Sequence, residues 1–207
     1  MQKKIAIVAL FVISLLSTVT MLTTTIIPVC ASPEVRDVAV VDVTPESDWL
    51  YQGKLCRANI NVTVCNEGNV SETFNVTLYY NMTAGLTIGE QTVTDLLPSN
   101  CTTLTFLWDT TGVTPCRNYT ITAYAWPVPY EIDQDDNTLE DGIIHVKMLG
   151  DVNGDGIIDV TDVYIACVAF GTSLGWPGYN PAVDVNNDGF IDILDLYTVA
   201  INFGKTC

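Results

Sequence analysis

The stretch DVNGDGIIDVTD, residues 151–162, returns 33 residues later as DVNNDGFIDILD, residues 184–195. In each copy, acidic or amide side chains occupy positions 1, 3, 5, 9 and 12, and glycine occupies position 6. This is the spacing of a calcium loop of the EF-hand kind, in which the glycine permits a sharp turn and position 7 offers its backbone carbonyl. An acidic surface loop without a ligand has no reason to repeat such a pattern with both glycines in place.

The repeat predicts two Ca²⁺ ions and their ligands. The ligands would be Asp151, Asn153, Asp155, the Ile157 carbonyl, Asp159 and Asp162 in the first loop, and Asp184, Asn186, Asp188, the Phe190 carbonyl, Asp192 and Asp195 in the second. All are hard oxygen donors, and their number suits Ca²⁺ better than Mg²⁺, which prefers a water-rich octahedron. Because the carboxylates of each loop repel one another without a cation, we expect metal binding to be coupled to folding.

Two features set these loops apart from an ordinary EF-hand pair. Position 12 is Asp rather than Glu, and residues 142–150, which precede the first loop, are β-like rather than helical. The exiting segments 160–171 and 193–204 have apolar residues at helical spacing and end in Phe-Gly, a helix stop. A loop and helix repeated once within 149–207 resembles a type I dockerin.

The dockerin resemblance implies calcium-dependent binding to cohesin modules of other proteins. It also implies that recognition uses loop positions 10 and 11, which hold Val160 and Thr161 in the first copy and Ile193 and Leu194 in the second. Exposed apolar residues of this kind indicate an interface. Its partner is either a cohesin-like module or the N-terminal domain of the same chain, because only Leu149 and Gly150 separate that domain from the first loop.

Residues 35–148 alternate between polar and apolar side chains in short runs broken by turn residues, which predicts strands. We expect seven strands, at 36–43, 57–65, 73–81, 87–95, 102–109, 117–126 and 141–148. About seven short strands in roughly 110 residues are typical of an immunoglobulin-like β-sandwich. The expected fold is therefore mainly β with a small α module. The runs NVTVCNEGNVSETFNVTLYY and EIDQDDNT resemble CARDB-type (cell-adhesion-related) domains of bacterial and archaeal surface proteins.

The N-terminus is typical of an exported protein. Lys3 and Lys4 precede an apolar run at residues 5–16, and Val29-Cys30-Ala31 offers a cleavage site, so we expect residues 1–31 to be a signal peptide. An uncleaved membrane anchor is the alternative. Cleavage leaves six cysteines, which in an exported protein indicates disulfides. We expect the pairs Cys56–Cys116, Cys65–Cys101 and Cys167–Cys207, with a buried Cys167 and a free Cys207 as the alternative to the last.

The same segment carries six Asn-x-Ser/Thr sequons, which predict glycosylation in an exported chain. They are Asn61, Asn69, Asn75, Asn81, Asn100 and Asn118. The loop at 131–141 holds six carboxylates, which favour a solvated acidic hairpin and leave a weak extra cation site as the alternative.

Charge and motifs narrow the functional class. The net charge of −16 argues against nucleic acid and anionic membranes as partners. The only histidine is His145 and the paired carboxylates are committed to calcium, so we do not expect an enzyme. Three functions remain: a secreted docking adaptor, a cell-surface structural or adhesion glycoprotein with the dockerin packed against its own sandwich, and a carbohydrate-binding accessory protein of a polysaccharide-degrading system.

Overall fold

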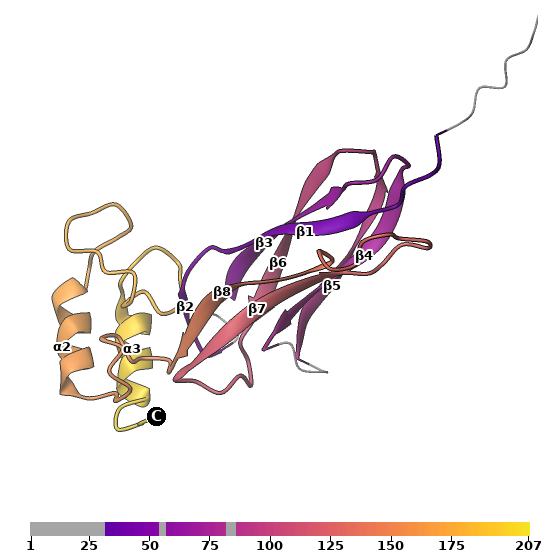
Figure 1. Cartoon of the computed structure of the whole chain (residues 1–207). Helices are drawn as coiled ribbons and strands as arrows, with labels where there is room; N and C mark the ends of the chain where they lie inside the picture. The colour runs from indigo at the N-terminus through magenta and orange to yellow at the C-terminus, as the bar shows by residue number, and fades with distance from the viewer. Residues whose placement is uncertain (1–31, 54–56, 82–85) are drawn as a thin grey trace, which may run out of the picture. The chain divides into compact units, whose positions relative to one another are not determined.

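The computed structural model describes residues 32–53, 57–81 and 86–207. Figure 1 shows strands in the N-terminal part of the described chain and helices near the C-terminus. In chain order the elements are β1 Val38–Pro45, β2 Trp49–Tyr51, β3 Arg57–Asn66, β4 Glu72–Tyr80, β5 Thr87–Leu96, β6 Cys101–Asp109, β7 Arg117–Ala125, β8 Thr138–Lys147, α2 Val160–Ala169 and α3 Ile193–Ile201.

The strands form two sheets, one in the order β1-β3-β6 and the other in the order β2-β8-β7-β4-β5. Alternate residues of β3, such as Ile60, Val62 and Val64, are fully buried, whereas Asn59 and Asn61 between them are exposed. The inward residues of both sheets form one apolar core around Trp108, Leu78 and Ile144. The predicted mainly β fold with a β-sandwich and a small helical module is confirmed.

Strand β2 is absent from the sequence prediction. It has three residues, and it pairs in parallel with β8 through Trp49 opposite His145 and Tyr51 opposite Lys147. Three residues are too few to show an alternating pattern, so hydrophobic periodicity could not reveal this strand. It matters because β2 carries Tyr51 to the C-terminal module.

The C-terminal module has a small core of its own. Ile158 and Ile191, at position 8 of the two repeated loops, are fully buried with Ala166 and Val199. Helices α2 and α3 pack side by side (Figure 1). Each helix starts at the predicted residue and ends two or three residues before the predicted end, and Gly171 and Gly204 follow them with positive φ angles of 82° and 84°.

Each loop of the module pairs with the segment that follows the other loop's helix. Ile158 N donates to Lys205 O (2.9 Å), and Ile158 O accepts from Gly204 N (2.8 Å). In the second loop, Ile191 exchanges the equivalent bonds with Thr172 and Gly171. The duplication is therefore structural, because neither loop is complete without the other half of the repeat.

The sandwich and the module meet directly within the compact unit Glu34–Cys207. Tyr51 and Val185 are buried together, with Trp49 and Leu149 packed against them. The short connection at Leu149 and Gly150 is thus part of a contact rather than a tether.

The disulfides correct two predictions. Cys65 and Cys101, a predicted pair, lie opposite each other on β3 and β6 and are bonded. Cys116 pairs with Cys207 rather than with Cys56, and Cys167 is free and exposed on α2 instead of bonded to Cys207.

The reason for the correction is the path of the C-terminal tail. Cys207 N donates to Gly156 O (2.9 Å), which holds the tail along the first loop, and partly buried Cys116 packs against the core of the module. Sequence separation alone gave no sign of this approach. Cys56 lies outside the described residues, as do Cys30 and the predicted signal peptide.

No helix in the described part of the chain is long and apolar enough to cross a membrane.

We expect the double variant Cys116→Ser/Cys207→Ser to unfold more easily than the native protein. The bridge spans 91 residues, and loss of a native disulfide costs roughly 2–5 kcal/mol. Chemical denaturation followed by circular dichroism measures the loss, and Cys167→Ser serves as the control without an effect. A non-reduced peptide that links Cys116 to Cys56 would contradict the pairing.

Candidate metal centre and helix face

Asp151, the first residue of the first loop, organises the turn that follows it. Its two carboxylate oxygens accept hydrogen bonds from Gly154 N (2.8 Å) and Gly156 N (3.0 Å). Gly156 has a φ angle of 84°, which a residue with a side chain rarely adopts. The glycine predicted at position 6 therefore lets the loop curl around the first carboxylate.

Asp162, at position 12, closes the loop and starts the helix at once. Its Oδ1 accepts from Val152 N (2.8 Å), at the beginning of the loop, and its Oδ2 accepts from Asp159 N (2.9 Å). The Asp159 carboxylate in turn accepts from Thr161 N (2.6 Å). Asp159 and Asp162 form a capping box at the start of α2, which satisfies N–H groups that have no partner inside the helix.

The second loop repeats this arrangement. Asp184 accepts from Asp188 N (3.1 Å) and Gly189 N (2.8 Å), and Gly189 has a φ angle of 86°. Asp195 accepts from Val185 N (3.0 Å) and Asp192 N (2.9 Å), and Asp192 with Asp195 caps α3. The two copies agree in structure as closely as they do in sequence.

The remaining predicted ligands lie at the rim of each loop. Asn153 accepts from Asp155 N (3.0 Å) and donates to Asp155 Oδ2 (2.8 Å), and both side chains are exposed. Asn186 and Asp188 make the same pair of contacts in the second loop. Ile157 and Phe190, whose carbonyls are the predicted position-7 ligands, each form an isolated β-bridge. The chain therefore brings the predicted positions of each loop into one turn.

The four aspartates at positions 1 and 12 are buried. Asp162 and Asp195 are 0% exposed, Asp151 is 2% and Asp184 is 5%. Burial first, and then neighbouring carboxylates such as Asp162 for Asp151 and Asp184 for Asp195, raise the pKa of Asp151 and of Asp195. None of the ion pairs among the described residues involves these four side chains.

This donor set fits a hard cation. The predicted ligand atoms of each loop are all oxygens, and buried negative charge without a basic partner is costly unless a cation offsets it. In the described residues, no three Asp, Glu, His or Cys side chains are gathered closely enough to count as a metal cluster. The carboxylates are instead turned toward the backbone N–H groups of their own loops.

Two tyrosines that the sequence analysis missed support the loops from outside. Tyr179 donates its hydroxyl to Asp184 Oδ2 (2.7 Å), and burial together with this bond raises the pKa of Tyr179 to about 12. Tyr51 of β2 donates to Ala182 O (2.6 Å) and also lies 3.3 Å from Asp151 O. One sandwich residue thus contacts the backbone of both halves of the repeat. No motif marks either tyrosine.

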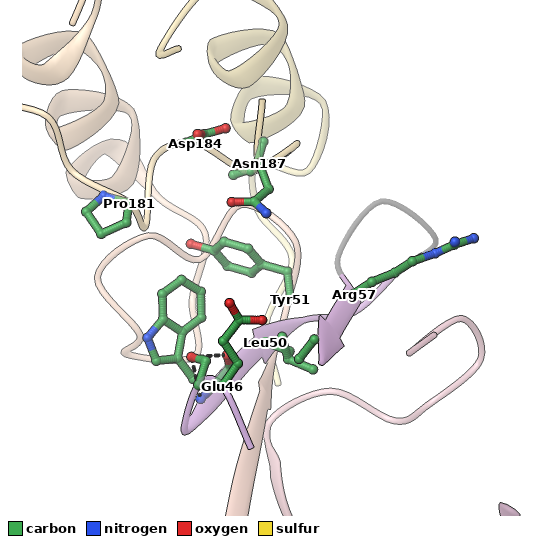
Figure 2. Close-up of a pocket in the computed structure, with 11 residues that line it drawn as sticks. Glu46, Leu50, Tyr51, Arg57, Pro181, Asp184 and Asn187 are labelled. Carbon is green, nitrogen blue, oxygen red and sulfur yellow. Dashed lines mark hydrogen bonds between the residues drawn. The ribbon is translucent and has the colours of Figure 1, made fainter. Parts of the chain in front are cut away.

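A cavity of about 260 Å³ lies beside Tyr51 and is lined by β2 and by Pro181, Asp184 and Asn187 of the module. Figure 2 shows the residues that line it. Tyr51 points toward the module, whereas Arg57 extends away from it. Because Asp184 lines this cavity, the second loop faces the sandwich at its first ligand position.

The predicted docking residues are exposed. Val160 is 69%, Ile193 is 65% and Leu194 is 56% exposed, and Thr161 is exposed as well. Val160 and Ile193 each begin a longer apolar stripe on their helix. The first stripe consists of Val160, Tyr164 and Val168, and the second, 33 residues later, consists of Ile193, Tyr197 and Ile201. The repeat spacing could have revealed both tyrosines from the sequence.

Comparison with known proteins confirms the predicted C-terminal module, since residues 149–202 match the model of the dockerin type I domain family. No curated protein sequence matches the chain.

Among solved structures, the CARDB domain of a Pyrococcus furiosus protein in complex with di-metal ions is 24% identical, with a TM-score of 0.43, and the match covers 56% of this chain and 98% of that one. A domain of a cell surface protein from Methanosarcina acetivorans is 28% identical, with a TM-score of 0.42, covering 54% and 92%. A β-glucosidase from Erythrobacter marinus is 18% identical, with a TM-score of 0.40, covering 54% and 15%. The strand pairing within the two sheets by itself defines the β-sandwich.

We expect Asp151→Asn and Asp184→Asn each to remove one Ca²⁺ ion from the full-length protein. Each change removes one charge and one of the two oxygens that hold the turn, so affinity at that loop should fall at least about tenfold. Calorimetric titration with Ca²⁺ measures the number and affinity of the ions. Asp95→Asn, at an exposed position outside the loops, should leave both unchanged. Unaltered binding in both loop variants would exclude these ligands.

We expect Tyr51→Phe to destabilise the module by about 1–2 kcal/mol, because buried carbonyls lose their hydroxyl donor. Thermal unfolding with Ca²⁺ and with a chelator measures the change. Tyr130→Phe is a matched control, since Tyr130 is 92% exposed. Equal melting temperatures for the two variants would show that Tyr51 does not support the loops.

Proposed function

We propose that this chain, which carries a dockerin type I domain at residues 149–202, is an exported, non-catalytic docking protein. With Ca²⁺ in its two loops, the domain binds a cohesin-like module of another protein. It thereby displays a glycosylated immunoglobulin-like domain outside the cell or at its surface.

The observation that carries the proposal is the pair of apolar stripes on α2 and α3. Tyr164 is 67% and Tyr197 is 60% exposed, and each lies between two exposed aliphatic residues of its own helix. Contiguous apolar surface of this kind is rare on a soluble domain unless it meets a partner. Aromatic residues flanked by aliphatic ones are also typical of the centre of a protein interface.

The contact between the module and the sandwich favours a partner from another chain. The sandwich touches the module through Leu149, Val185 and the C-terminal tail. Neither apolar stripe takes part in that cluster. Packing within the chain therefore fixes the module while leaving the stripes available, which argues against the alternative in which the sandwich itself occupies them.

Calcium dependence follows from the position of the ligands. Asp162 and Asp195, each the predicted last ligand of its loop, are each the third residue of a helix. The first residue of each stripe, Val160 or Ile193, comes two positions earlier. A cation held by the loop would therefore order the helix turn that presents the docking residues, and the dockerin family implies the same dependence.

Glycosylation of the sandwich is supported by the exposure of its sequons. Asn61, Asn69, Asn81, Asn100 and Asn118 are exposed, and Asn75 is half-buried on β4. Sugars at these positions would cover the sandwich and leave the module bare, since no sequon lies after residue 118.

A carbohydrate-binding role is the second candidate. Trp126 is 48% exposed and stacks edge-on against Tyr124, with its ring nitrogen donating to Thr77 Oγ1 (2.9 Å). Trp108, which could also have contributed to a sugar face, is only 2% exposed and belongs to the core. An edge-on pair offers less flat surface for a sugar ring than two coplanar rings do, so docking is the better supported function.

The docking proposal is tested with the full-length protein and a panel of purified type I cohesin modules in a biosensor. We expect binding in Ca²⁺ and its loss in a chelator. Tyr164→Ala/Tyr197→Ala should weaken binding by about 2 kcal/mol or more, roughly 30-fold, because these residues lie at the centre of the stripes. Both are exposed, so the fold should be unaffected.

The control is Tyr130→Ala, which removes an even more exposed tyrosine from the sandwich and should bind like the native protein. Failure of every cohesin module to bind, or equal binding in the chelator, would refute docking. Glycan-array binding that disappears in Trp126→Ala would favour the carbohydrate role instead.

A further inference from the structure

Three buried oxygen atoms of the sandwich have no hydrogen-bond partner. They are Asp37 Oδ1, Asp136 Oδ1 and Asn137 Oδ1, and no other buried side-chain nitrogen or oxygen of the described residues is left in this way. Buried polar atoms are almost always paired, and each exception costs about 1–3 kcal/mol. All three atoms are acceptors, and Asp136 and Asn137 are neighbours in the chain, so a single cation could satisfy them together.

The three residues lie on two segments that are held against each other. Val40 N donates to Asp136 O (2.9 Å), and the Asn137 side chain donates to Val38 O (3.1 Å). These bonds fix the residue before β1 beside the residues before β8. The residues thus come from a rigid junction of the sandwich, far in sequence from the repeated loops.

Glu131 positions the Asn137 amide. Its Oε1 accepts from Val38 N (2.9 Å) and from Asn137 Nδ2 (3.1 Å), and its Oε2 accepts from Val128 N (2.8 Å). Val38 O and Glu131 Oε1 both accept from Asn137 Nδ2, so the orientation of the amide is fixed. Its Oδ1 is then the atom without a hydrogen-bond partner. Asn137 is only 1% exposed, which makes it a built-in ligand rather than a surface side chain.

The local charge is strongly negative. The pKa of Asp37 is raised to about 6, by burial first and then by the negative charges of Asp136, Asp133, Glu131 and Glu67. Burial and the same kind of neighbours also raise the pKa of Asp136. The nearby cation, Arg36, is engaged by Glu72 and Glu34, each at 3.2 Å. The junction therefore holds two partly buried carboxylates that take part in none of the ion pairs of the described residues.

We propose that Asp37, Asp136 and Asn137 form a third cation site, in the sandwich, for a hard divalent ion such as Ca²⁺. Two carboxylate oxygens and an amide oxygen are the donors that Ca²⁺ prefers, and the set contains no nitrogen or sulfur ligand that would favour a transition metal. The site joins β1 to the segment before β8, so its ion would brace the sandwich and not the docking module.

The test is the number of Ca²⁺ ions bound by the full-length protein, measured by equilibrium dialysis against ⁴⁵Ca²⁺. Asp37→Asn/Asp136→Asn should bind one ion fewer than the native protein. Asp95→Asn/Asp141→Asn removes the same charge from two exposed positions and should bind the native number. Because the test compares the number of bound ions between variants, it can be interpreted whether or not the repeated loops bind calcium.

The melting temperature in a chelator is a second measurement, which shows whether the double variant still folds. Without the cation, the two carboxylates only repel each other, so Asp37→Asn/Asp136→Asn should melt at the same or a higher temperature than the native protein. The single variant Asp136→Asn should also bind one ion fewer, or bind it at least tenfold more weakly. Equal ion counts in all variants, or a double variant that is unfolded in the chelator, would overturn the site.

Discussion

Everything in the C-terminal module depends on two buried carboxylates, Asp162 and Asp195. Each one joins the start of its loop to the start of its helix, through hydrogen bonds from residues ten and three positions earlier. The same carboxylate therefore sets loop closure, helix capping and ligand position, and the apolar stripes follow from where the helices begin.

The duplication gives this small module its stability. A single loop and helix would expose the buried isoleucine at position 8 and leave the backbone of that position without a partner. Because Ile158 bonds to the tail after α3 and Ile191 bonds to the segment after α2, each half completes the other. The hydrogen bonds from Tyr51 add the sandwich as a third support. The small module is therefore stabilised without burying the two apolar stripes in its own core.

The sequence was most informative where structure is determined locally. Loop ligands, glycines and helix starts depend on spacing within twelve residues, so Asp151, Gly156 and Asp162 could be assigned before any coordinates. The Cys116–Cys207 bond could not, because it depends on the tail folding back along Gly156. Strand β2 was missed because its parallel pairing with β8 leaves no periodic signal in three residues.

The acidic loop before β8 illustrates the same limit. Its carboxylates favoured the prediction of a solvated hairpin. Nothing in the local sequence pattern shows that Asp37, almost a hundred residues earlier, lies beside Asp136. The burial of Asn137 is likewise a property of the folded sandwich. A site built from distant segments cannot be predicted from local motifs, whereas the repeated loops could be recognised because all their predicted ligands lie within twelve residues.

The bond between Cys116 and Cys207 also has a mechanical consequence. A docking protein is under tension whenever its partner and the opposite end of its chain move apart. Both helices lie between the two cysteines, so a force applied to them would reach the sandwich along two covalent paths, one through the segment that follows β8 and one through this bridge next to β7. The module would therefore stay joined to the sandwich even if one of the two paths were cut.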